Sequence, residues 1–273
     1  MARLLRGKAV KDKFIADLEK RCGDLREKGI RPCLGIFRVG NDADTLSYEK
    51  SIGKTLEDLG IEVRVSALEA NAPKALAELV LFDLVCKKEI DGVLPMMPLP
   101  ETILPLLDKI LPEKDVDGVL REKSGFSPCT PEAAVRLAEE YGLLKANTKC
   151  VVLGRSPLVG TPLAKILQEK GFSVDVVHSQ TEDPFAKVKA GDVIFSAVGK
   201  PRFLDSRYLR HGQSVIDIGV CEDGNGGICG DLDETAAEAL DIDYSPVPGG
   251  VGRITTVILA EHVIRSCEER RGS

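Results

Sequence analysis

Apolar and polar residues follow two periods along the chain, one typical of helices and the other of strands. Helical spacing predicts helices over 8–29, 44–59, 72–88, 131–141, from 160 to about 170, and over 255–270. Short apolar runs predict strands over 32–39, 61–65, 91–94, 150–153, 173–177, 192–197 and 214–218. Because strands and helices alternate, the pattern predicts an α/β fold of parallel strands joined by crossover helices.

A polar segment over 111–131, rich in Gly and Pro, interrupts this rhythm. Loops of this length in compact domains are usually functional or disordered. We therefore expect two α/β domains, over 1–138 and 139–254, with the final helix 255–270 packing back on the first. The second domain is predicted to be a Rossmann-like, doubly wound parallel sheet with helices on both faces.

Composition excludes several classes of protein. The 273 residues are 43% hydrophobic and 29% charged, as in ordinary globular proteins, and no apolar run approaches the length of a membrane span, about 18 residues. Charged residues interrupt the N-terminal segment, so we expect no secretory signal and a cytoplasmic location. The net charge of −6 and 4% aromatic content give no indication of a nucleic-acid partner.

The eight cysteines contain no CxxC pair, and only three histidines accompany them. We therefore expect reduced thiols and no metal site.

The turn after the predicted strand 150–153 has the geometry of a phosphate site. Gly154, Arg155, Ser156 and Gly160 stand between this strand and a helix, whose N-terminal N–H groups can bind an anion. The spacing is not GxGxxG, and an ordinary tight turn is the alternative interpretation.

The end of the next strand favours NADP over NAD. An acidic residue there would bind the adenosine ribose hydroxyl of NAD, but His178 and Ser179 follow the strand instead. Together with Arg155 they suit a 2′-phosphate. The alternative is that Arg155 is a solvated surface charge and His178 a capping residue.

Further Gly-rich turns follow other predicted strands, at Gly199, Gly219 and 249–250. Ligands of open α/β sheets bind beyond the carboxyl ends of the strands, so these turns are expected at one crevice. The segment 246–252, PVPGGVG, indicates a rigid loop whose backbone approaches a ligand; the alternative is a tight connector. In the first domain Tyr48, Asp115 and Asp117 could contact a ligand, although isolated residues of these types are more often surface groups.

Taken together, the motifs PEKDVDG, SPCTP, GRSPLVGTP, VGKP, IDIG and PVPGGVG, in this order along the chain, resemble the bifunctional methylenetetrahydrofolate dehydrogenase/cyclohydrolase family. The resemblance implies an N-terminal folate-binding domain, a C-terminal NADP-binding domain, a folate cleft between them and a homodimer in one-carbon metabolism. The family oxidises 5,10-methylene-tetrahydrofolate with NADP+ and hydrolyses the methenyl product to 10-formyl-tetrahydrofolate.

The resemblance also implies site residues. Tyr48 matches the tyrosine that stacks on the folate, and Asp117 the aspartate that holds the pterin; both are expected to be catalytic. Other expected substrate contacts are Pro248, Gly249 and Gly250. Expected cofactor contacts are Gly154, Arg155, Ser156, Gly160, His178, Ser179, Gly199, Val220 and Thr255.

The chain departs from the family pattern at two catalytic positions. The family lysine, four residues after the tyrosine, is Ile52, and the family glutamine is Met96. Lys50 and Lys54 lie on either side of Ile52, but at about 100° per residue each points away from its face. Arg253 and a short loop over 118–128 are further departures.

These departures affect the two reactions differently. Hydride transfer needs alignment of substrate and cofactor, whereas hydrolysis needs proton transfer, whose loss typically costs about 10²–10⁴-fold. We therefore expect dehydrogenase activity with weak or absent cyclohydrolase activity. The alternatives are a fully bifunctional enzyme in which Lys50 or Lys54 reaches the cleft, a folate- or nucleotide-binding paralogue without turnover, and an enzyme for a different acidic substrate.

Overall fold

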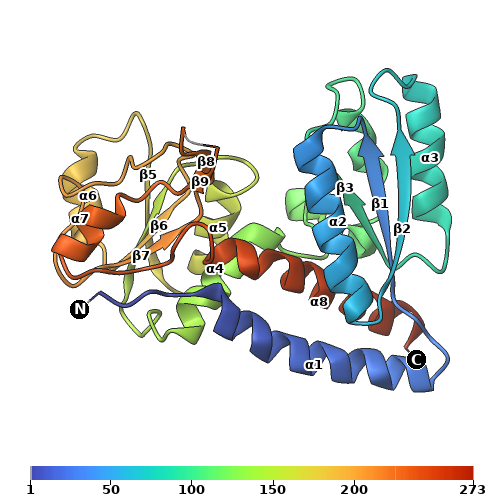
Figure 1. Ribbon diagram of the computed structural model, residues 1–273, viewed down its shortest axis with the longest axis horizontal. Coiled ribbons are helices and arrows are strands. Elements are labelled where there is room, and N and C mark those ends of the chain that lie inside the picture. Colours follow the sequence, from blue (N-terminus) through green and yellow to red (C-terminus); the bar gives the residue numbers. More distant parts are fainter. Residues whose placement is uncertain (1, 225, 273) are drawn as a thin grey trace. The chain divides into compact units, whose positions relative to one another are not determined.

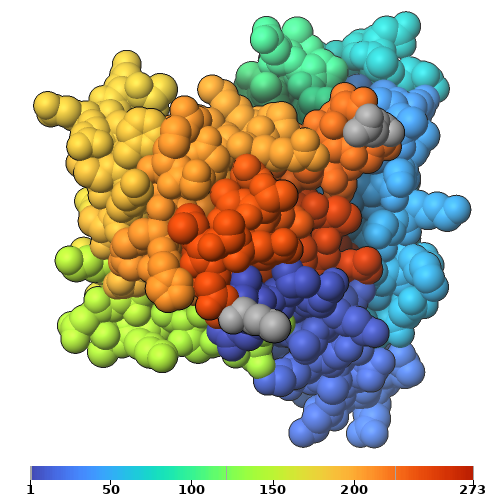
Figure 2. Space-filling model, turned by 60° about the vertical axis from the view of Figure 1, so that its left-hand side comes forward, coloured from blue at the N-terminus to red at the C-terminus, as the bar shows by residue number. Residues whose placement is uncertain are grey.

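The computed structural model describes residues 2–224 and 226–272, which divide into two compact units. The three-strand unit comprises Lys13–Cys129 and the chain from Thr256 onward, and the five-strand unit comprises the chain up to Asp12 and Thr130–Thr255. The boundary thus lies earlier than the expected 138, and the first residues join the second unit. The reason is visible at Leu5, whose N–H donates to the Tyr244 carbonyl oxygen at 2.8 Å. Figure 2 shows these dark-blue residues against the orange-red segment.

The three-strand unit has a parallel sheet in the order β2-β1-β3 (Figure 1). Its strands are β1 (Cys33–Val39), β2 (Glu62–Leu68) and β3 (Gly92–Pro95). Its helical elements are α1 (Gly7–Glu27, which begins in the other unit), α2 (Ala43–Asp58), α3 (Lys74–Cys86), the 3₁₀ turns η1 (Leu104–Lys109), η2 (Pro112–Lys114) and η3 (Arg121–Lys123), and α8 (Thr255–Arg271).

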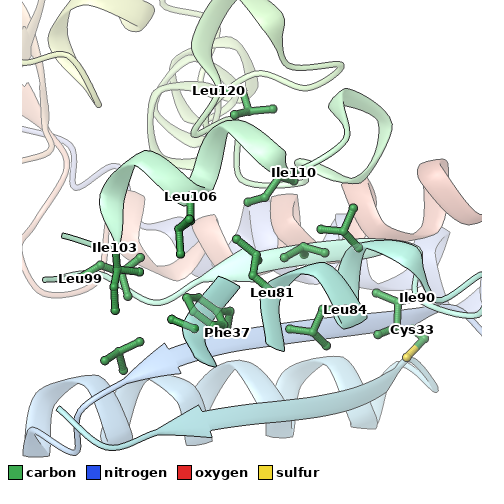
Figure 3. Packing of buried hydrophobic residues seen from close by; sticks show 14 residues of the cluster. Cys33, Phe37, Leu81, Leu84, Ile90, Leu99, Ile103, Leu106, Ile110 and Leu120 are labelled. Atoms are coloured by element: carbon green, nitrogen blue, oxygen red, sulfur yellow. The ribbon is translucent and has the colours of Figure 1, made fainter. Parts of the chain in front are cut away.

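Alternating residues of β1 divide this unit into two packed faces. Phe37 is fully buried and packs with Leu81 and Leu84 of α3 and Leu106 of η1 (Figure 3). Because successive strand residues point to opposite faces, Arg38 points away from this cluster, toward the face on the other side of the sheet.

The five-strand unit has a parallel sheet in the order β10-β7-β6-β4-β5. Its strands are β4 (Lys149–Leu153), β5 (Ser173–Val177), β6 (Val193–Ser196), β7 (Ser214–Asp217) and β10 (Asp243–Tyr244), with a separate hairpin of β8 (Cys221–Glu222) and β9 (Ile228–Cys229). Its helical elements are α4 (Cys129–Glu140), α5 (Gly160–Glu169), α6 (Pro184–Ala190), α7 (Glu234–Ala239) and the turn η4 (Val251–Arg253). The strand order reverses between β4 and β6, as in doubly wound folds that bind ligands at this point.

Every helix and strand expected from the sequence has a counterpart in the structure. The elements not predicted are short: α6, α7, the β8–β9 hairpin, β10 and the 3₁₀ turns η1 to η4. Elements of two to seven residues are too short to show a period. In the part of the chain that is described, no helix combines the length and the apolar character needed to cross a membrane.

Candidate functional site

The expected cofactor residues follow the carboxyl ends of neighbouring parallel strands. Gly154 follows β4, His178 follows β5, Gly199 comes soon after β6 and Val220 soon after β7. Because these strands are parallel, their carboxyl ends share one edge of the sheet, and the turns meet there. The reversal of strand order between β4 and β6 places Gly154 at the crevice where dinucleotides bind in such folds.

Two glycines let the chain pass closely at this crevice. Gly154 has φ +102°, and a Cβ there would collide with the carbonyl oxygen of Ala197, which follows β6. A Cβ at Gly160 would collide with the carbonyl oxygen of Gly154. Both positions therefore require glycine, because the backbone of this turn packs closely against itself and against the chain after β6.

Arg155 links two of the expected cofactor turns. Its Nη2 donates to Oε1 of Gln180 at 3.0 Å, so the guanidinium lies beside the segment that follows β5. Ser179, next to Gln180, is exposed. The guanidinium therefore lies beside the turn that contains Ser179, and a cation at this place suits a phosphate.

The hydroxyl of Ser156 binds the start of α5. Its Oγ accepts from the N–H groups of Val159 and Gly160, each at 3.3 Å. After β5 the N–H of His178 donates to Thr181 Oγ1 at 2.9 Å, and His178 Nδ1 accepts from the Gln180 N–H at 3.2 Å. His178 thus organises its own turn, which agrees with its alternative interpretation as a capping residue.

Two buried aspartates, which the sequence analysis missed, hold the turns after β6 and β7. Asp231 accepts from Ser196 Oγ at 2.8 Å and from the N–H groups of Val198 at 2.7 Å and Lys200 at 2.8 Å. These bonds place Gly199, between Val198 and Lys200. The motif GDLD contains Asp231, but its role depends on contacts with residues more than thirty positions away.

Asp217, the second buried aspartate, ends β7. Its carboxylate accepts from the N–H groups of Gly219 at 3.0 Å, Asp231 at 3.2 Å and Leu232 at 2.8 Å. Burial, reinforced by the nearby charge of Asp231, raises the pKa of Asp217 to about 7, although the backbone N–H groups lower it. The turn before Val220 is therefore attached to a carboxyl group that titrates near neutral pH.

The loop 246–252 of the five-strand unit is tightly packed. Gly249 has φ +119°, and its carbonyl oxygen accepts from the N–H of Gly7 at 2.9 Å. The Gly250 N–H donates to the Pro246 carbonyl oxygen at 2.7 Å, and Thr255 Oγ1 donates to that of Gly252 at 3.2 Å. The loop is fixed against the first residues of α1, so it is both a connector and a rigid backbone surface.

In the three-strand unit, α2 presents Tyr48 and buries Ile52. The Tyr48 side chain is 49% exposed, whereas Ile52, one helical turn later, is completely buried. Lys50 is exposed, and Lys54 pairs with Asp58 at 3.3 Å with most of its side chain in solvent. Neither lysine lies on the buried face of α2, in agreement with the helical angles.

Met96 follows the last residue of β3 and is buried. Its N–H donates to the Phe37 carbonyl oxygen at 2.8 Å. Arg38, the next residue of β1, is also buried, and its Nε pairs with Glu49 of α2 at 2.7 Å. The ion pair next to Tyr48 was not predicted, because the sequence does not show that Arg38 and Glu49 meet.

The alternative view of Asp115 and Asp117 as surface groups is wrong. Asp115 is completely buried and accepts from the N–H groups of Val119 at 3.0 Å and Leu120 at 2.9 Å. Asp117 is half-buried, and burial raises its pKa to about 6, although the thiol and N–H of Cys129 lower it by hydrogen bonding to the carboxylate. At neutral pH the carboxylate is therefore mostly ionised and can accept from N–H donors.

Val116, which precedes Asp117, packs against the start of β3. A Cβ at Gly92, the first residue of this strand, would come within 2.6 Å of Val116 Cγ1. Met96 follows the other end of the strand.

The segment 111–131, expected to be functional or disordered, is an ordered loop held by α8. His262 Nδ1 lies 2.8 Å from the Val116 carbonyl oxygen, and its ring centroid lies 4.9 Å from that of Phe126. Ser266 Oγ lies 2.6 Å from the carbonyl oxygen of Asp91 and 2.7 Å from that of Glu113, and its one proton can be donated to either. The final helix thus contacts this loop at Val116, directly before Asp117, and farther away at Glu113 and Phe126.

A buried lysine attaches the same loop to α3. Lys114 Nζ donates to the carbonyl oxygens of Val85 at 2.6 Å and Lys87 at 2.7 Å, at the end of α3. Burial lowers the pKa of Lys114 to about 8. Within residues 2–224 and 226–272, no group of three or more His, Cys, Asp or Glu side chains could hold a metal ion.

Two family models match the chain. The tetrahydrofolate dehydrogenase/cyclohydrolase catalytic domain matches residues 5–117, and the NAD(P)-binding domain of the same family matches residues 128–271. The second match begins near the boundary between the two compact units.

Relatives of known sequence and structure agree with this match. The chain is 35% identical to the bifunctional protein FolD of Carboxydothermus hydrogenoformans, over 100% of the chain and 99% of that protein. It is 36% identical to FolD of Clostridioides difficile, over 97% and 96%. The crystal structure of the FolD dehydrogenase/cyclohydrolase of Campylobacter jejuni superposes with a TM-score of 0.93 at 32% identity, covering 99% of this chain and 100% of that one. A Trypanosoma brucei FolD, complexed with NADP and an inhibitor, has a TM-score of 0.88 at 27% identity and covers 98% of each chain.

Proposed function

Because this chain belongs to the tetrahydrofolate dehydrogenase/cyclohydrolase family, we propose that it oxidises 5,10-methylene-tetrahydrofolate to 5,10-methenyl-tetrahydrofolate with NADP+ as the hydride acceptor. The fold of the five-strand unit and the FolD relatives support this reaction. A homodimer and a cytoplasmic location are part of the same proposal.

One observation carries the choice of NADP. The Arg155 guanidinium donates to Gln180, beside Ser179, so a cation and a hydroxyl lie at the end of β5 where an NAD-binding fold would have an acidic residue. The collision that a Cβ at Gly154 would make with Ala197 shows how closely the backbone is packed at the start of this crevice. These features fit a dinucleotide with a 2′-phosphate.

In this proposal each chain segment has a role in binding or alignment. Arg155 and Ser179 hold the 2′-phosphate, and the Gly-rich turn between β4 and α5 lies beside the pyrophosphate. NADP+ held in this way would supply the acceptor for the hydride of the methylene carbon. The Asp117 carboxylate accepts from the N–H groups of the pterin, and the exposed Tyr48 ring stacks on the folate.

We further propose that the cyclohydrolase step is weak or absent. Hydrolysis of the methenyl cation requires that water be activated and a proton be moved. The buried side chains of Ile52 and Met96 can do neither, and Lys54 points into solvent, where it pairs with Asp58. The full bifunctional reaction would need a rotation of α2 that removes Ile52 from its buried position.

The test is to assay both steps on the purified protein. Adding 5,10-methylene-tetrahydrofolate and NADP+ should produce NADPH and methenyl product in equal amounts, and the methenyl product should then decay at its uncatalysed rate. Absence of NADPH would reject the dehydrogenase and favour a binding paralogue without turnover. Enzymatic decay of the methenyl product would establish the bifunctional alternative.

A further inference from the structure

The hairpin after β7 places two cysteines directly opposite each other. Strands β8 and β9 are antiparallel, and their register pairs Cys221 with Cys229 and Glu222 with Ile228. Directly opposite residues of an antiparallel pair project to the same face, with Cα atoms about 4.5 or 5.5 Å apart. Disulfides join Cα atoms about 4.4–6.8 Å apart, so this register brings the two thiols within bonding range.

Hydrogen bonds fix this register at both ends of the hairpin. At its tip, the Asp223 N–H donates to the Gly227 carbonyl oxygen at 3.0 Å, and the Gly227 N–H donates to Asp223 Oδ1 at 2.9 Å. At its base, Asp217 Oδ1 accepts from Gly219 at 3.0 Å and from Asp231 at 3.2 Å. One carboxylate therefore binds the chain just before β8 and just after β9. A slip of one residue, which would separate the thiols, would break bonds at both ends.

Both cysteines are free thiols that solvent can reach. Cys221 and Cys229 are partly exposed, whereas Cys22, Cys33, Cys129, Cys150 and Cys267 are buried. Cys229 Sγ lies 4.0 Å from the carbonyl oxygen of Glu222, the residue next to Cys221. Among the described residues, no His, Asp or Glu completes a metal site around this pair. Its available chemistry is that of a dithiol.

We propose that Cys221 and Cys229 form a redox-active dithiol that closes to a cross-strand disulfide by exchange with a low-molecular-weight disulfide such as glutathione disulfide. One protein thiolate attacks a sulfur of glutathione disulfide, so that a mixed disulfide forms and one glutathione thiolate leaves. The second protein thiolate attacks the protein sulfur of the mixed disulfide and releases the second glutathione. The two protein sulfurs are oxidised, glutathione disulfide is reduced to two glutathione molecules, and these take the two protons. The cross-link lies directly after Val220, and its formation does not depend on the proposed enzymatic reaction.

The sequence allows a direct test by mass spectrometry. No Lys or Arg lies between 211 and 252, so Cys221 and Cys229 fall in one tryptic peptide without any other cysteine. The folded full-length protein is equilibrated with glutathione disulfide and glutathione, quenched with acid, alkylated and digested. We expect this peptide to lose two hydrogen atoms and to resist alkylation, and to take two alkyl groups when it is reduced first.

Matched variants separate the pair from ordinary thiol reactivity. In Cys221→Ser and Cys229→Ser the remaining cysteine should keep a glutathione adduct, because no second thiol can displace it. Cys86, which is exposed, should carry an adduct in every variant and shows that the reagent acted. Unfolding in urea should lower the ratio of internal disulfide to adduct by about tenfold or more, because the hairpin raises the effective concentration of one thiol near the other.

Three results would overturn the proposal. They are glutathione adducts on both cysteines without an internal disulfide, no reaction of the pair while Cys86 is modified, and an equal ratio in the folded and unfolded protein.

Discussion

His262 Nδ1 lies 2.8 Å from the carbonyl oxygen of Val116, the residue before Asp117. Because a carbonyl oxygen can only accept, Nδ1 carries the proton and donates it. Both groups belong to the three-strand unit, and His262 is almost completely buried. A side chain of the last helix therefore fixes the backbone beside the residue expected to hold the pterin.

Replacing His262 should weaken folate binding. In His262→Leu the buried carbonyl of Val116 loses its shorter hydrogen bond and keeps only the one from the Cys129 thiol at 3.4 Å. The loss costs about 0.5–1.5 kcal/mol, and the Asp117 carboxylate can shift. We expect the KM for 5,10-methylene-tetrahydrofolate to rise about tenfold, with the KM for NADP+ unchanged. His262→Asn should restore binding, because its amide nitrogen can occupy the place of Nδ1.

Ser266→Ala is the matched control for this variant. It removes the hydroxyl that donates to Asp91 or Glu113 from the same helix, so it should lower thermal stability with little effect on the KM. If His262→Asn were as impaired as His262→Leu, the donor at Nδ1 would not be what positions Asp117.

Arg155→Ala should change cofactor choice. The charge-assisted contact with a 2′-phosphate is lost, and such contacts contribute about 1.5–3 kcal/mol, so the KM for NADP+ should rise about tenfold to a hundredfold. The KM for NAD+, which lacks this phosphate, should change less than about twofold. Initial rates measured with each cofactor give the two KM values.

Gln180→Ala is the control, because it removes only the partner of the guanidinium. It should give a smaller rise in the KM for NADP+. If Arg155→Ala raised the KM for NADP+ and the KM for NAD+ equally, Arg155 would not contact the 2′-phosphate.

The double variant Ile52→Lys with Met96→Gln should raise cyclohydrolase activity. Restoring a proton-transfer group typically gives about 10²–10⁴-fold, provided that the lysine ammonium can reach water from the buried position of Ile52. Decay of the methenyl product measures the gain, and circular dichroism checks the fold. Ile52→Met with Met96→Leu is the control, since both remain apolar. A folded double variant without any gain would show that the site differs beyond these two side chains.

Asp217 should make stability depend on pH. Burial raises its pKa from 3.8 to about 7 in the folded protein, so between these values the folded state binds more protons than the unfolded state. The stabilisation of the folded state that comes from Asp217 is fully present below pH 3.8 and is lost as the pH rises through about 7. We expect the unfolding free energy to fall by roughly 2–3 kcal/mol between pH 5 and pH 8 from this group.

Urea titrations at these two pH values measure the effect. Asp217→Asn should be less stable at pH 5 and should lose this part of the pH dependence. Asp12→Asn, on the exposed side of α1, should leave it intact. An unchanged pH dependence in Asp217→Asn would assign the titration to another group.

The sequence by itself determined the order and type of the longer elements. Apolar periods of the predicted helices and strands extend over enough residues to be read directly, and the Gly-rich turns mark where the strands end. The six motifs between Pro112 and Gly252 were sufficient to indicate the family. The missing proton-transfer groups at Ile52 and Met96 are equally a matter of sequence, because they depend only on residue identity.

Only the tertiary structure decided which distant residues meet. Arg155 and Gln180, Asp217 and Asp231, and His262 and Val116 are pairs separated along the chain, and no local pattern links them. The same holds for the burial of Asp115 and for the inclusion of the first residues in the five-strand unit, where Leu5 bonds to Tyr244. The physical reason is that periodicity reports which face of an element is buried, whereas hydrogen bonding and the pKa of a carboxyl group depend on what the rest of the chain brings to that face.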